Sequence, residues 1–202
     1  MINKLLIPLR SVSILLCFFL THNLVYSQQN KLFKENKEFW YISASTGVQM
    51  SGIKNEDFIS SNIAPLLKID IGKWISPEVS IQVGYQGPYF HTIADDIKHY
   101  YYYLYGQALF SINKIINEKR EYWKNWNIIV HPGGGYFYNR LYEHPNICAN
   151  IGIMNKFRFF EKVELFFDFS AVMGWDIYQG NKDILPNCSL GVNYIIDPYK
   201  KR

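Results

Sequence analysis

Apolar and polar residues alternate with a period of two along most of the chain from Phe39 onward. In the segment 79–86 (VSIQVGYQ), Val79, Ile81, Val83 and Tyr85 interleave with Ser80, Gln82, Gly84 and Gln86. This period places successive side chains on opposite faces of a β-strand, one apolar and one polar. The pattern recurs in eight segments, and we predict a strand over each of them: 39–50, 64–75, 79–91, 99–112, 126–138, 147–159, 163–175 and 187–196.

The segments that connect these strands form two sets. Long connections, rich in charge or in Asn, Asp and Pro, cover 51–63, 92–98, 139–146 and 176–186. The other connections are the short turns at 76–78 (SPE) and near 161–162, with the longer segment 113–125 as an exception. Outer-membrane barrels have short turns at the periplasmic end and long loops at the other. We therefore interpret 113–125 as a periplasmic excursion that contains a short helix.

Alternation alone fits a soluble barrel of lipocalin type as well as a membrane barrel, and the polar face distinguishes them. That face consists mainly of Ser, Gly, Gln, Asn and Tyr, which suit the crowded interior of a barrel with about eight strands. It also carries charges of both signs. Because buried charges must pair or form hydrogen bonds, we predict an internal ion-pair network among Lys68, Asp70, Lys156, Arg158, Glu164 and Asp168.

The apolar face is aromatic at both ends and aliphatic in the middle. One end carries Trp40, Phe110, Trp126, Phe157 and Phe159, and the other carries Tyr85, Tyr89, Tyr102, Tyr136, Tyr138 and Trp175. Bilayers select aromatic girdles at both interfaces. We therefore predict an all-β fold: an eight-stranded antiparallel up-and-down transmembrane β-barrel of the cell outer membrane. Its apolar residues face lipid, and its polar residues, such as Ser80, Gln82 and Gln86, face the lumen.

The N-terminus has the pattern of an export signal. Lys4 and Arg10 precede the apolar run 12–20, and small residues follow near Ser27; the run is too short to span a bilayer as a helix. We expect a cleaved signal peptide at 1–27, a periplasmic linker at 28–38, the barrel at 39–196 and a short basic tail at 197–202.

Charge and cysteine content limit the kinds of partner, cofactor and metal site that we expect. Of 21 basic and 17 acidic residues, two basic ones lie in 1–27, which leaves a net charge of +2 and no reason to expect nucleic acid as a partner. Cys148 and Cys188 remain after the signal is removed, and we expect them to be unpaired. No metal-ligand spacing of Cys and His occurs. We assign no catalytic, cofactor-binding or metal-binding residue, and we expect no cofactor.

The stretch 72–87 (GKWISPEVSIQVGYQG) resembles small outer-membrane barrels of Bacteroidota type, in which a Gly-Lys-Trp strand, a Ser/Thr-Pro turn and a Gly-Tyr-Gln-Gly strand follow in this order. HPGGGYFY at 131–138 and the run at 150–169 resemble later strands of those barrels. In many relatives the barrel precedes a peptidoglycan-binding domain like that of outer-membrane protein A; here six residues follow 196, and we therefore expect no wall-anchoring role. Relatives also tend to end the barrel on an aromatic residue, where this chain has Ile196. The resemblance implies a fold and a location, without a chemical activity.

Three functions remain open. The first is a non-enzymatic surface barrel with a filled lumen, whose loops bind a partner or stabilise the membrane. Its partners would be outer-membrane lipid, lipopolysaccharide and, during assembly, the barrel-insertion machinery. The second is a lipid A-modifying acyl hydrolase or transferase that uses His91, with Asp95, Asp96 and His99 close in sequence and a nucleophile from Ser60 or Ser61. The third is the barrel subunit of a secretion or envelope assembly complex with an unknown protein partner.

One further motif invites a binding role. His131 and the glycines at 133–135 suggest a phosphate-binding loop. We reject that interpretation because no helix follows to meet the phosphate. Glycine in a strand more often permits a bend or a close backbone approach.

Overall fold

The computed structural model describes residues 38–51, 63–91, 98–116, 125–175, 177 and 182–196. The regions predicted as signal peptide and basic tail, most of the linker, most of the predicted loops 51–63 and 92–98, residues 117–124 of the predicted excursion and part of the loop 176–186 lie outside the described residues. The described chain forms one short helix, α3 (Ile112–Ile116), and nine strands. The strands are β1 (Phe39–Met50), β2 (Ile63–Trp74), β3 (Val79–His91), β4 (Lys98–Ser111), β5 (Trp126–Val130), β6 (Gly133–Asn139), β7 (His144–Arg158), β8 (Val163–Trp175) and β9 (Lys182–Ile196).

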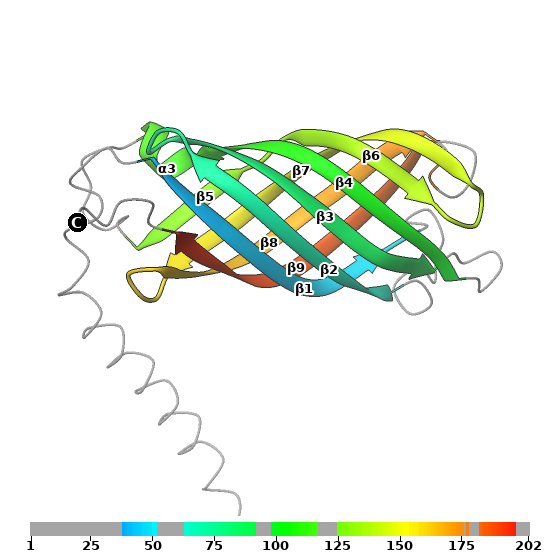
Figure 1. Ribbon diagram of the computed structural model, residues 1–202, viewed down its shortest axis with the longest axis horizontal. Helices are drawn as coiled ribbons and strands as arrows, with labels where there is room; N and C mark the ends of the chain where they lie inside the picture. Colours follow the sequence, from blue (N-terminus) through cyan, green and yellow to red (C-terminus); the bar gives the residue numbers. More distant parts are fainter. Residues whose placement is uncertain are drawn as a thin grey trace, which may run out of the picture.

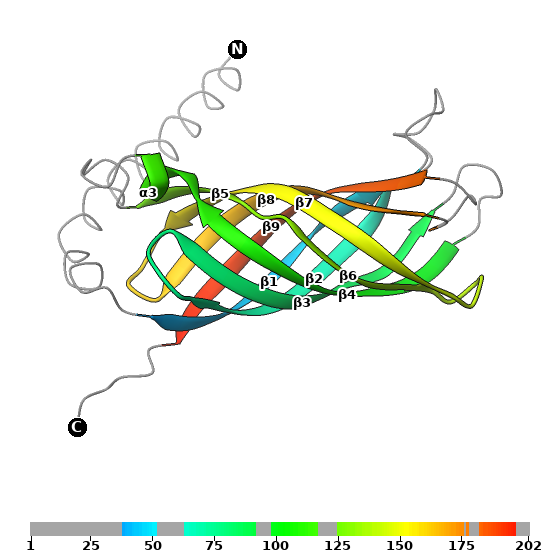
Figure 2. The same cartoon turned by 90° about the horizontal axis from the view of Figure 1, so that it is seen from above.

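The strands close into an antiparallel up-and-down barrel (Figures 1 and 2). Strands that follow each other in sequence pair antiparallel, except that β5 and β6 both pair with β4 and β7. The barrel closes where β1 pairs both with β2, from Phe39↔Trp74 to Met50↔Ile63, and with β9, from Trp40↔Ile196 to Gln49↔Asn187. Closure of the described strands pairs both edges of the sheet. This matters in a membrane because lipid cannot form hydrogen bonds with the backbone groups of an open edge. The predicted fold class is confirmed.

The predicted strand 126–138 is divided into β5 and β6 by His131 and Pro132. Proline has no N–H to donate to a sheet and is found at breaks and bulges. Both pieces nevertheless lie between β4 and β7. The wall stays closed at the break, because His131 N–H donates to Gly152 O (3.0 Å) and Pro132 O accepts from Ala108 N–H (3.0 Å).

Two connections are shorter than expected. The segment 139–146, predicted as a long loop, is a turn at 140–143 because β7 already begins at His144. Asn139 Oδ1 stabilises that turn by accepting from Leu141 N–H (2.9 Å). Similarly, β9 begins at Lys182, so part of the predicted loop 176–186 is strand.

The two ends of the barrel differ. The start of β1, the end of β9, helix α3 and the turns at 75–78 and 159–162 lie at one end, on the left of Figure 1. The helix begins at Ile112 and covers the first residues of the segment 113–125, where a short helix was expected. The turn at 140–143 and the starts of β2, β4 and β9 lie at the opposite end.

Burial alternates along the strands as the sequence predicted. In β3, Ile81 and Val83 are 52% and 58% exposed, whereas Ser80 and Gln82 are 0% and 5% exposed. The barrel therefore turns its aliphatic side chains outward and its polar side chains inward, the reverse of a soluble barrel. No helix in the described part of the chain is both long and apolar enough to cross a membrane.

Candidate functional site

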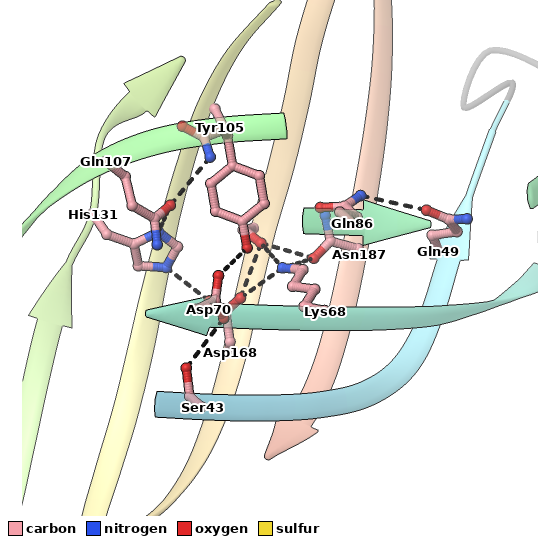
Figure 3. Close-up of polar contacts among 12 residues, drawn as sticks. Ser43, Gln49, Lys68, Asp70, Gln86, Tyr105, Gln107, His131, Asp168 and Asn187 are labelled. Atoms are coloured by element: carbon pink, nitrogen blue, oxygen red, sulfur yellow. Dashed lines mark hydrogen bonds and ion pairs between the residues drawn. The ribbon is translucent and has the colours of Figure 1, made fainter. Parts of the chain in front are cut away.

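The centre of the lumen holds a buried ion pair between β2 and β8. Lys68 Nζ lies 2.9 Å from Asp168 Oδ2, and the two side chains are 8% and 3% exposed. The ammonium also donates to Ser170 Oγ (2.9 Å) and Asn187 Oδ1 (2.7 Å), so its three protons are all used (Figure 3). This arrangement satisfies the charge of Lys68 entirely from side chains of the barrel.

The second carboxylate oxygen of Asp168 contacts an imidazole that sequence reasoning had left without a role. His131 Nε2 lies 2.8 Å from Asp168 Oδ1, and His131 Nδ1 lies 3.2 Å from Gln107 Oε1. Gln107 Oε1 also accepts from Asn150 Nδ2 (3.1 Å). The break between β5 and β6 thus places His131 in the ion-pair layer. Its inward parity was visible in the sequence, but its partner 37 residues away was not.

Asp70 differs from the prediction in one respect. It was expected in the ion-pair network, but among the described residues it forms no ion pair; it accepts from Tyr105 OH and from Ser43 Oγ (3.2 Å), and it also has a hydrogen bond with the Gln82 side chain (Figure 3). Hydroxyl donors satisfy a carboxylate without a direct ion pair.

A second charged cluster lies nearer the end that carries α3. Glu164 accepts from Arg158 Nη2 (2.7 Å) and Asn193 Nδ2 (2.6 Å), and Lys156 Nζ lies 3.5 Å from it. The same ammonium lies 5.1 Å from the centre of the Tyr41 ring, a cation–π contact. Together with Lys68 and Asp168, this cluster confirms the predicted internal ion-pair network for five of its six residues.

Apolar layers enclose the central polar layer on both sides. Tyr41, Trp74, Leu109, Ile129, Met154 and Phe166 form one buried cluster. The other contains Phe90, Tyr101, Tyr103, Phe137, Val172 and Leu185, and its Tyr101 and Phe137 rings stack with centres 4.8 Å apart. The alternation assigned Tyr41 and Tyr103 to the inward face, but it gave no indication of the lumen-facing aliphatic and Phe residues.

The central layer leaves very little free space. A cavity of about 10 Å³, lined among others by Lys68, Asp70 and His131, remains there, which is room for about one water molecule. Within the described residues, side chains rather than an open channel occupy this section of the lumen, as expected for a barrel of about eight strands.

The residues of the lipid A-modifying hypothesis are not brought together as a site in the described structure. Asp95, Asp96, Ser60 and Ser61 lie outside the described residues, as does the side chain of His91. His99 is completely buried and stacks on Phe90, with ring centres 5.0 Å apart. It is part of the lumen packing rather than of a lipid-facing rim.

The glycine-rich segment that suggested a phosphate loop is explained by close backbone packing. A Cβ on Gly135 would lie 2.1 Å from Leu104 O, and one on Gly133 would lie 2.4 Å from Gly106 O. Both glycines belong to β6, where it pairs with β4. They permit the two backbones to approach, which is the alternative favoured by the sequence.

The outer surface carries the predicted aromatic residues at both ends. Trp126 and Phe157 stack at the α3 end with ring centres 6.2 Å apart, and Tyr102 and Tyr138 stack toward the opposite end at 5.3 Å. The two remaining cysteines are free: Cys148 is buried on the lumen side, whereas Cys188 has the outward parity of β9 and is half-buried.

Comparison with known proteins identifies a similar fold but no sequence family. Neither family models nor curated proteins match the chain. Neisserial surface protein A (NspA) superposes with a TM-score of 0.51 and 11% identity, over 77% of this chain and 96% of that one. The fold is that of a small outer-membrane β-barrel. At this identity the likeness concerns the fold alone.

Two further solved structures are similar at lower scores. Ail, the attachment invasion locus protein of Yersinia pestis, in complex with the heparin analogue sucrose octasulfate, has a TM-score of 0.49 at 10% identity, over 79% of this chain and 99% of that one. The N-terminal β-barrel domain of Pseudomonas aeruginosa OprF has a TM-score of 0.44 at 13% identity, over 76% and 97%. The resemblance to barrels of Bacteroidota type stays a prediction.

Proposed function

We propose that the protein is a non-enzymatic integral barrel of the outer membrane that acts through its surface, by binding a partner or by stabilising the membrane. One observation carries the proposal: an aliphatic outer wall encloses a lumen filled by side chains, with ion pairs between its buried charges and apolar layers around them. A filled lumen favours a structural or binding role over transport through the barrel. Exposed loops are where binding residues usually concentrate.

The finer parts of the proposal concern relatives and partners. The motif at 72–87 supports descent from barrels of Bacteroidota type related to those that precede domains like that of outer-membrane protein A. The partners that we propose are outer-membrane lipid, including lipopolysaccharide, and the barrel-insertion machinery during assembly. The lipid-facing wall supports the first. Closure of the barrel through β1 and β9 supports the second, whereas Ile196 at the end of β9, in place of an aromatic residue, weakens the expected recognition by that machinery.

Gel mobility tests the proposal. The protein is extracted from urea-washed outer membranes and run in SDS with and without boiling. A closed, SDS-resistant barrel retained in the membrane migrates faster when it is not boiled, and this is the expected result. Release by urea together with a single mobility would overturn the proposal and favour the soluble, lipocalin-like alternative with a ligand in its lumen.

A further inference from the structure

Two cations lie on the outward face of the barrel at the end opposite α3. Lys98 is the first residue of β4, and Arg140 directly follows β6. Arg140 N–H donates to Tyr100 O (2.8 Å), which sets Arg140 beside Tyr100 on the neighbouring strand. Lys98 precedes Tyr100 by two residues and therefore shares its face of the sheet. Both cations are exposed.

Tyrosine residues lie near these cations on three adjacent strands. Lys98 Nζ lies 5.3 Å from the centre of the Tyr89 ring, and that ring lies 5.7 Å from the ring of Tyr100. Closer to the middle of the barrel follows the stacked pair of Tyr102 and Tyr138. The cations thus lie just beyond the aromatic girdle, at the level where lipid headgroups meet a membrane barrel.

Among the described residues, neither Lys98 nor Arg140 forms an ion pair. Lys73 offers a contrast at the opposite end of the barrel, where it lies 5.9 Å from the Trp40 ring centre and pairs with Glu38. Two exposed cations beside tyrosine rings, without an ion pair in the described part of the chain, are available to an anion at the membrane surface, and headgroup phosphate is such an anion.

We propose that Lys98 and Arg140, framed by Tyr89 and Tyr100, bind the phosphate groups of lipid A in the outer leaflet. This inference rests on the proposed function, which directs the end opposite α3 away from the cell. Arginine presents a planar fork that fits phosphate oxygens, whereas lysine supplies a mobile point charge. The tyrosine rings offer flat, partly polar surfaces to the sugar rings that carry those phosphates.

Native mass spectrometry of the purified barrel in detergent micelles, titrated with lipid A, tests the site. The Lys98→Gln/Arg140→Gln double variant is expected to lose affinity for lipid A by about tenfold or more, because two charge-assisted contacts are removed. The matched control Lys73→Gln removes an exposed, ring-stacked lysine at the other end and is expected to bind as the wild type does. The wild type is expected to bind dephosphorylated lipid A about tenfold more weakly than lipid A.

Several outcomes would overturn the inference. Equal affinity of the double variant and the wild type would remove these two residues as the site. Equal affinity of the wild type for lipid A and for its dephosphorylated form would show that phosphate is not the ligand. Equal affinity for lipid A and for phosphatidylglycerol would show that the site is not specific for a phosphorylated glycolipid. If the double variant fails to fold, the two single variants and the titration of the wild type with dephosphorylated lipid A test the inference instead.

Gel mobility of the same samples separates this inference from the proposed function. If the wild type shows the heat-dependent shift but the lipid A result fails, only the phosphate site is wrong. If the wild type itself shows no shift, the membrane barrel and the site that depends on it both fail.

Discussion

Lys68 and Asp168 carry opposite charges in a layer of the lumen with room for about one water molecule. Water does not screen such a pair, and removing one partner leaves the other charge buried and uncompensated. The exposed pair of Lys73 and Glu38 differs, because its side chains are 30% and 56% exposed and water solvates both. The two pairs therefore provide a direct comparison of a buried with an exposed ion pair in one molecule.

We expect Asp168→Asn to lower the free energy of unfolding by about 3–5 kcal/mol, because Lys68 and His131 both lose their charged partner. Urea titration of the barrel in lipid or detergent, followed by the gel-mobility shift, measures the change. The control Glu38→Gln is expected to cost about 1 kcal/mol or less. Similar losses for the two variants would contradict the assigned role of the lumen pair.

The sequence predicted which of these side chains face inward but not every partner. Arg158 and Glu164 face each other across the short turn at 159–162, so their pairing follows from local spacing. Lys68 and Asp168 are 100 residues apart, and their contact depends on how the whole barrel closes. The same holds for His131, whose role emerges only where β5 and β6 lie beside β7 and β8.

At the scale of the elements, the fifth predicted strand shows what periodicity misses. Pro132 interrupts the segment 126–138, and its missing N–H was a signal for the division into β5 and β6. The alternation continues across the break with unchanged parity, so a single strand fits the pattern equally well. The early starts of β7 and β9 were missed because their first residues do not alternate clearly in sequence.

Close packing of β6 against β4 leads to a second prediction. Gly135→Ala places a methyl group against the backbone oxygen of Leu104, which has no freedom to move aside as a side chain does. We expect a loss of about 1–3 kcal/mol, the usual range for overpacking. The urea midpoint of the variant barrel measures this loss.

Gly106 on the partner strand provides the matched control. A Cβ there would meet only Gln82 O, at 3.9 Å, and the position is exposed on the outer face. We expect Gly106→Ala to change stability by no more than about 0.5 kcal/mol. Equal effects of the two substitutions would show that close backbone approach is not what Gly135 provides.

At the scale of the whole molecule, the barrel is inverted relative to a soluble one, because its apolar side chains face outward. Such an outer surface suits lipid rather than water. Alternation gives every strand an apolar and a polar face. Which of the two faces the lumen is decided only when the strands close into a barrel. The mainly small and uncharged character of the polar face was sufficient to predict the correct direction, because the polar face of a soluble barrel carries many more charged side chains and the few charges here can pair inside the lumen. The apolar layers within the lumen, built from residues such as Leu109 and Phe137, required the three-dimensional structure.

The outward orientation of Val83 is the most direct test of this account. In a Val83→Cys variant that carries Cys148→Ala and Cys188→Ser, a nitroxide attached at position 83 is placed in lipid bilayers. Its collisions are then compared between molecular oxygen, which concentrates in the hydrocarbon, and a water-soluble nickel chelate. A membrane barrel predicts frequent collisions with oxygen and few with nickel, because Val83 lies midway along β3 on the exposed apolar face. A label that oxygen seldom reaches, or that nickel reaches more readily, would place Val83 inside the barrel or in water and contradict the inverted arrangement.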